Sequence, residues 1–282
     1  MSTFTIARLT FYEASRRKIL LAALLLGVLF LIIYGLGFHY LMLDVEDSIG
    51  IRDRVQLNEI RNFLLMAGMF VVNFLTSVMA VLTSVDTVSG EINSGTIQTL
   101  AAKPIRRWEL ISGKWLGFAV MLTLYLLLMA GGVMAIVYLR TGYSAPHPFR
   151  GLGLLWLNVL LLLSVSIFGG TFLSTLANGV LVFGLYGIAF IGGWIEQIGS
   201  YMGKVSAGQV AIKIGIITSL IMPSEAIWRR TVFELQSPLV KALGFSPFSA
   251  LYYPSTYMVL YAVLFLLAAF AMAVWLFSQR DL

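Results

Sequence analysis

Few side chains in this 282-residue sequence have the types and spacing that catalysis requires. Gly90 and Gly95 have the spacing of a phosphate-binding loop, but Thr96 follows where such a loop carries the lysine that reaches the phosphates. Residues that would serve as nucleophile, base and orienting group lie in separate predicted loops, so we assign no catalytic residue. The chain by itself is therefore not expected to be an enzyme or to hydrolyse ATP.

A soft-metal path is the second chemical hypothesis, and it rests on two methionines and two histidines. Met66 and Met69 share one side of a predicted helix, while His39 and His147 fall near one predicted membrane surface. The competing interpretation is ordinary packing, because methionine is common in apolar cores and two histidines without fixed spacing do not make a site. The chain has no cysteine, which excludes disulfides and thiolate ligands. We predict no metal site and no cofactor in this chain.

The composition defines the class of protein that must position any functional residues. Hydrophobic residues make up 59% of the chain and charged residues only 11%, and the mean hydropathy is +0.91. A soluble domain would have about 25% charged residues, so this is an integral membrane protein. The net charge of +6 comes from basic residues beside apolar runs, which favours contact with lipid headgroups and not with nucleic acid.

Six apolar runs without Asp, Glu, Lys or Arg indicate membrane-spanning helices, since about twenty helical residues cross the hydrocarbon core. The predicted spans are residues 19–38, 63–85, 115–139, 152–176, 179–195 and 256–277. Before them, residues 1–18 predict an interfacial helix with Phe4, Ala7, Phe11 and Ala14 on one face. Ala177 and Asn178 form a tight predicted connection that makes the fourth and fifth spans antiparallel neighbours. We expect an all-α polytopic protein with one membrane domain, residues 1–282.

The number of spans and the basic residues predict the orientation. An even number of spans places both termini on one side, and Arg16, Arg17 and Lys18 directly before the first span indicate that this side is the cytoplasm. The predicted location is therefore the cytoplasmic membrane, with multiple spans and cytoplasmic N- and C-termini.

Residues 86–114 form a polar and charged island between two apolar runs. Thr96 is placed to cap a short helix through Ile97 and Leu100, and Pro104 ends that helix and suits the start of the next. A plain connection needs only a few residues, so a folded segment of this length favours a docking surface. An equally good interpretation is an amphipathic linker on anionic lipid. Its lipid-binding cations would be Lys103, Arg106, Arg107 and Lys114.

The island also carries a dense residue pattern. Its members are Glu91, Gly95, Thr96, Ile97, Leu100, Lys103, Pro104, Ile105, Arg107, Gly113 and Lys114. This pattern resembles the cytoplasmic loop of ABC-2 type transporter permeases, in particular the subgroup that includes the NosY-like subunits. The segment from Ile6 to Lys18 resembles the amphipathic elbow helix of the same family. The resemblance implies that the island carries a coupling helix and contacts a separate ATP-binding subunit.

The resemblance implies a membrane-spanning permease subunit of an ABC transporter, with export as the more frequent direction in the family. Its implied partners are two ATP-binding subunits, which bind ATP and magnesium, and a second permease chain, most simply an identical one. We assign the coupling role to Glu91, Gly95, Thr96, Ile97, Leu100, Lys103, Pro104 and Arg107. Two other functions stay open: an ion-driven secondary transporter or channel, and a non-transporting complex member that passes a mechanical signal to an outer partner.

Residues 196–255 form a predicted extracytoplasmic segment with structure of its own. The run 210–222 is too short to span and predicts a re-entrant or interfacial helix, after which Pro223 begins another. The functional interpretation is an outer gate or a seat for an extracytoplasmic partner, with Glu196, Pro223, Glu225 and Trp228 as its candidate residues. The alternative is an anchoring helix with Trp228 at the interface and Arg229, Arg230 and Glu234 facing water or headgroups. Glu196, at the end of a span, can then simply meet water.

Overall fold

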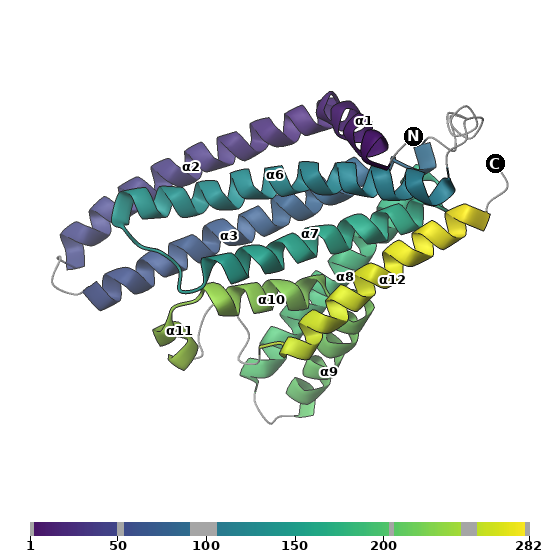
Figure 1. The fold of residues 1–282 in the computed structure, drawn as a ribbon. Coiled ribbons are helices and arrows are strands. Elements are labelled where there is room, and N and C mark those ends of the chain that lie inside the picture. Colours follow the sequence, from purple (N-terminus) through teal and green to yellow (C-terminus); the bar gives the residue numbers. More distant parts are fainter. Residues whose placement is uncertain (1–2, 50–53, 91–105, 203–205, 244–252, 280–282) are drawn as a thin grey trace.

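The computed structural model describes residues 3–49, 54–90, 106–202, 206–243 and 253–279, and this part of the chain is helical without a strand (Figure 1). Six helices are long and apolar enough to span a membrane. They are α2 (Lys18–Ile49), α3 (Arg54–Ser84), α6 (Arg107–Thr141), α7 (Pro148–Gly170), α8 (Thr175–Tyr201) and α12 (Thr256–Gln279). The expected all-α polytopic class and the six spans are confirmed.

Four shorter helices complete the described part of the chain. They are α1 (Thr3–Ser15), α9 (Ser206–Ile221), α10 (Ser224–Leu235) and α11 (Pro238–Leu243). Together α9 and α10 are apolar enough to span, but they meet at an angle of 105°, so the pair forms either a broken seventh span or a re-entrant loop. Figure 1 shows α3, α6 and α7 running side by side, with α2 outside α6 and α12 crossing at a slant.

The helices extend beyond the predicted apolar runs because backbone hydrogen bonding continues after the hydrocarbon ends. α2 continues through Asp44 and Glu46, and α6 begins at Arg107, well before its apolar run. Glu109 supports that start, since its carboxylate accepts a hydrogen bond from the Arg106 backbone N–H at 3.3 Å. A negative group in the first helical turn is favourable there.

The predicted connection at Ala177 and Asn178 is wrong. α7 ends at Gly170, and Ser174 caps α8 by accepting a hydrogen bond from the Ala177 N–H at 3.4 Å. Asn178 is buried inside α8, where Nδ2 donates to the carbonyls of Val85 (3.1 Å) and Ser166 (2.9 Å). Asn178 followed by glycine suggests a turn, but here the amide ties α8 to α7 and to Val85, which directly follows α3. α7 and α8 remain in contact, although α8 packs most extensively against α9.

Glycines allow α8 and α9 to approach closely. A Cβ at Gly192 would lie 1.9 Å from Thr218 Oγ1, and one at Gly215 would lie 2.3 Å from Glu196 Cβ. Both distances are far shorter than van der Waals contact, so no larger residue fits without movement of the neighbour. This close approach brings Glu196 on α8 against the face of α9.

The interpretation of α10 as an interfacial helix with its charges facing water is contradicted. α10 lies along α7 in Figure 1, and Arg229 and Glu234 are only 3% and 6% exposed. Trp228 is buried and packs edge-on against Phe70 of α3, with ring centroids 5.6 Å apart. Charged residues on α10 are tolerated inside because they have ion-pair partners, as Glu234 has in Arg230 at 3.0 Å.

Candidate functional site

The predicted coupling residues other than Arg107 lie outside the described residues. They are Glu91, Gly95, Thr96, Ile97, Leu100, Lys103 and Pro104. Arg107, the first residue of α6, donates a hydrogen bond from Nη1 to the carbonyl of Ser278 on α12 at 3.3 Å. The site must therefore be built from the described residues that flank this segment.

Asp86, just after α3 and at the start of the island, is the centre of a polar cluster. We name this cluster the island base and define it as Arg17, Asp86, Thr87, Ser89, Lys114 and Thr175. Asp86 Oδ1 accepts a hydrogen bond from Thr175 Oγ1 at 3.0 Å, and Oδ2 lies 3.8 Å from Arg17 Nη1. The hydroxyls of Ser89 and Thr175 are 2.9 Å apart. These contacts join the end of α3, the turn between α1 and α2, and the start of α8.

Lys114 brings α6 into the island base. Its side chain is 5% exposed, and Nζ donates a hydrogen bond to the Thr87 carbonyl at 3.2 Å. The interpretation of Lys114 as a lipid-headgroup contact is therefore wrong, because the ammonium is turned into the protein. A buried charge needs such hydrogen bonds, so Lys114 holds α6 to the chain that leaves α3.

α1 packs closely on the same end of α6. A Cβ at Gly113 would lie 2.6 Å from Ile6 Cβ, and one at Gly117 would lie 2.7 Å from the Ala7 carbonyl oxygen. The buried positions of α1 are Ile6, Thr10 and Ala14, one turn apart from each other. The predicted apolar face is divided, since Ala14 is buried and Phe11 packs against the core, whereas Phe4 is 78% exposed.

A comparison with models of protein families assigns the chain to a family. The model described as ABC-2 family transporter protein matches residues 4–282. The chain belongs to this family. No curated protein matches the sequence. As an ABC-2 type permease, the chain is a multi-pass membrane component of an ABC transporter, and its family implies an ATP-binding partner.

In this ABC-2 permease, two of the four residues predicted as an outer gate, Glu196 and Glu225, lie at the junction of α8 and α10. Pro223 precedes α10, and its carbonyl accepts a hydrogen bond from the Ile227 N–H at 3.0 Å. Glu225 lies against α8, because a Cβ at Gly193 would be 2.2 Å from Glu225 Cγ. Glu196 lies on α8 nearby. Trp228 is directed away from them, toward α3.

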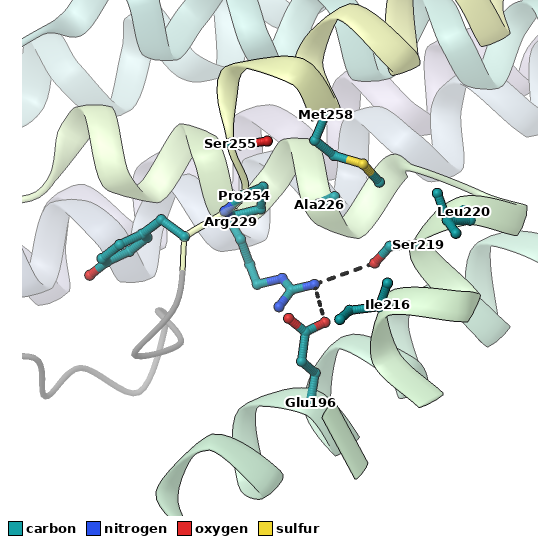
Figure 2. Close-up of a pocket in the computed structure, with 10 residues that line it drawn as sticks. Glu196, Ile216, Ser219, Leu220, Ala226, Arg229, Pro254, Ser255 and Met258 are labelled. Atoms are coloured by element: carbon teal, nitrogen blue, oxygen red, sulfur yellow. Dashed lines mark hydrogen bonds and ion pairs between the residues drawn. The ribbon is translucent and has the colours of Figure 1, made fainter. Parts of the chain in front are cut away.

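Glu196 does not simply meet water, which corrects the simpler interpretation of this residue. Its carboxylate Oε2 lies 2.8 Å from Nη2 of Arg229, and the two side chains are only 12% and 3% exposed. Figure 2 shows the guanidinium of Arg229 directed from α10 at Glu196. The same Nη2 atom donates a second hydrogen bond to Oγ of Ser219 on α9, at 3.4 Å. The sequence analysis missed this role of Arg229 and Ser219. The available signal was helical spacing, since Arg229 has Ala226 three positions before it and Val232 three positions after it.

Three of the four residues of the soft-metal hypothesis have other contacts, and His147 is exposed before α7. Met66 and Met69 are buried in the hydrophobic core, and His39 Nδ1 accepts a hydrogen bond from Arg140 Nε at 3.1 Å. Within the described ranges, no three His, Cys, Asp or Glu side chains come close enough to hold a metal ion.

Proposed function

We propose that this chain is the membrane-spanning subunit of an ABC transporter that exports a substrate across the cytoplasmic membrane. ATP hydrolysis takes place in separate subunits, two of which join two copies of this chain in the proposed assembly. The N- and C-termini are cytoplasmic in this proposal, so the island base faces the ATP-binding subunits. Arg17 of the island base and its neighbours Arg16 and Lys18 support that orientation, because basic residues favour the cytoplasmic side.

The observation that carries the proposal is the joining of four helices at the island base. The island leaves the described structure after Gly90 and returns at Arg106. Asp86 connects the start of the island to Arg17 and Thr175, and Lys114 connects α6 to Thr87. A partner that displaces the island would therefore move α2, α3, α6 and α8 together, because contiguous hydrogen-bonded contacts transmit displacement.

Within this proposal, the island residues have distinct roles toward the ATP-binding subunit. Gly95 permits close approach of the backbones, while Thr96 and Pro104 fix the shape of the coupling helix. Ile97 and Leu100 supply its apolar contact. Glu91, Lys103 and Arg107 offer charges for pairing with the partner.

Co-expression with candidate ATP-binding subunits tests the proposal. The wild-type chain is expected to retain such a subunit during affinity purification and to change its ATPase rate. Glu91→Ala and Gly95→Trp are expected to weaken the complex or to uncouple the ATPase rate from it, whereas Arg150→Gln on an exposed site of α7 serves as the control. A well-folded chain that retains no ATPase, and whose island tolerates both changes, would contradict the proposal.

The buried ion pair Glu196–Arg229 favours one alternative, an ion-driven secondary transporter. The sequence analysis found no charge within the six predicted spans, but the helix α8 extends through Glu196 and pairs it with Arg229. Buried charges within a membrane domain often belong to transport pathways. Flux in liposomes that contain this chain without ATP-binding subunits decides between the two functions, because only the ion-driven transporter is active there.

A further inference from the structure

A cavity of about 290 Å³ lies where α8, α9, α10 and the start of α12 meet (Figure 2). Its walls are mainly apolar and include Ile216, Leu220, Ala226, Pro254 and Met258. Sites for drug-sized ligands usually occupy about 300 to 1,000 Å³, so this cavity suits a headgroup or another small part of a larger molecule.

Arg229 provides a charged end to this cavity. Its Nη2 atom is engaged by Glu196 and Ser219, but Nε and Nη1 are buried and have no hydrogen-bond partner among the described residues. A guanidinium that is almost fully removed from water gains strongly from acceptors at each nitrogen. Nε and Nη1 do not open on the cavity in this arrangement, so the anionic oxygens of a ligand reach them when the Arg229 side chain turns toward the cavity that it lines.

Glu196 lines the same cavity, so the site has charges of both signs. Glu225 interacts electrostatically with Arg229 and Glu196 from the α8–α10 junction but does not line the cavity. A purely anionic ligand would be repelled by Glu196, and a purely cationic one by Arg229. A group with a negative and a positive charge beside each other matches both residues.

The rim of the cavity is suited to acyl chains. Ile216 and Leu220 line it and are each 48% exposed. On α12, Leu260 is also exposed, two positions after the cavity residue Met258. In a membrane protein, apolar side chains that are exposed on a spanning or re-entrant helix face lipid tails, which are as apolar as leucine. A lipid can thus place its headgroup at Arg229 while its tails stay in the bilayer.

We propose that this cavity binds the headgroup of a zwitterionic phospholipid that carries a primary ammonium group. The Arg229 side chain turns toward the cavity, so that the phosphate accepts hydrogen bonds from Nε and Nη1. The ammonium pairs with Glu196, and the acyl chains leave past Ile216 and Leu220. Binding requires no ATP-binding subunit. The further step, that the bound lipid is the cargo, rests on the proposed function.

Native mass spectrometry of the full-length chain, released from nanodiscs with equal amounts of phosphatidylethanolamine and phosphatidylglycerol, tests this binding. The wild-type chain is expected to retain phosphatidylethanolamine preferentially. Glu196→Gln removes the negative charge that lines the cavity beside Arg229 and is expected to shift the preference toward phosphatidylglycerol by about tenfold. Arg150→Gln removes a 3.8 Å ion pair between an exposed arginine on α7 and Glu234, which keeps its closer pair with Arg230, so this variant is expected to behave as the wild type.

The double variant Glu196→Gln/Arg229→Gln keeps the shape of both side chains and removes both charges. It is expected to lose retention of both lipids by about tenfold, and it leaves neither member of the Glu196–Arg229 pair charged without the other, so it can be measured even if Arg229→Gln alone fails to fold. Wild-type retention by the folded double variant, or a wild-type preference for phosphatidylglycerol, would overturn the proposal. Lipid retention is measured without ATP-binding subunits and ATPase coupling with them, so either proposal can fail alone.

Discussion

The island base and the Arg229 cavity are both polar regions between apolar helices, but they differ in how their charges are partnered. In the island base, Asp86 has contacts with both Arg17 and Thr175, and Lys114 donates to the Thr87 carbonyl. In the cavity, the guanidinium of Arg229 uses one nitrogen for Glu196 and leaves two buried nitrogens without a partner in the described structure.

This difference separates a region that holds helices together from a region that can accept a ligand. A polar network whose charges are partnered fixes the relative positions of its helices, as transmission of a displacement requires. A buried cation with unused donors beside a cavity gains free energy when a ligand supplies the acceptors. Variants that remove charges or close contacts in the two regions should therefore have effects of different size and kind.

The largest effect on stability is expected for Arg229→Leu. This change leaves the carboxylate of Glu196 in a nearly buried position without its cation, which costs about 3–5 kcal/mol of unfolding free energy. Thermal unfolding of the purified chain measures the loss. The double variant Glu196→Gln/Arg229→Gln is the matched control and should unfold much closer to the wild type. Equal destabilisation by both would show that the ion pair is not the cause.

An intermediate effect is expected for Gly117→Val at the contact between α1 and α6. A Cβ at Gly117 would lie 2.7 Å from the Ala7 carbonyl oxygen, so α1 must move, at about 1–3 kcal/mol. Gly131→Val is the control on the same helix, since a Cβ there meets no atom within 4 Å. The same thermal unfolding experiment compares them. Similar stability of the two variants would mean that α1 is not held against α6 as described.

The smallest effect on stability, but not on coupling, is expected for Asp86→Asn. The amide keeps an oxygen for Thr175 and loses only the ion pair with Arg17, whose side chains are 49% and 26% exposed, so less than about 1 kcal/mol is lost. We predict that ATPase stimulation by the ATP-binding subunit nevertheless falls, because the α1–α2 turn is no longer tied to the island. Normal stimulation of the ATPase by this variant would limit the role of Asp86 to local packing.

The sequence predicted the spans well because length and apolarity alone decide whether a helix can cross the membrane. It failed at Asn178, where a turn-forming pair lies inside α8 and the amide donates hydrogen bonds to α7 and to Val85, directly after α3. It also failed to extend α2 beyond its apolar run to Ile49. Both errors concern hydrogen bonds, which hydropathy does not measure.

The site was harder to predict because its residues are far apart in the sequence. Glu196 was singled out, but its partner Arg229 is 33 positions away and was expected to face water. Lys114 was expected at the lipid surface, although it is buried against Thr87. Periodicity shows which face of a helix is polar, but it does not show whether another helix supplies an opposite charge to that face. The coupling roles from Glu91 to Pro104 stay predictions.

The most direct test of the account asks whether nucleotide moves the island base as one unit. The chain has no cysteine, so pairs of cysteines can be introduced for spin labels at the exposed positions Leu9 on α1, Leu176 on α8 and Tyr257 on α12. Electron–electron double resonance measures the distances between the spin labels in the complex with its ATP-binding subunit, before and after nucleotide binding. We predict an unchanged Leu9–Leu176 distance and a changed Leu176–Tyr257 distance. An ATP-hydrolysing complex in which neither distance changes, or in which Leu9 and Leu176 separate, would contradict the account.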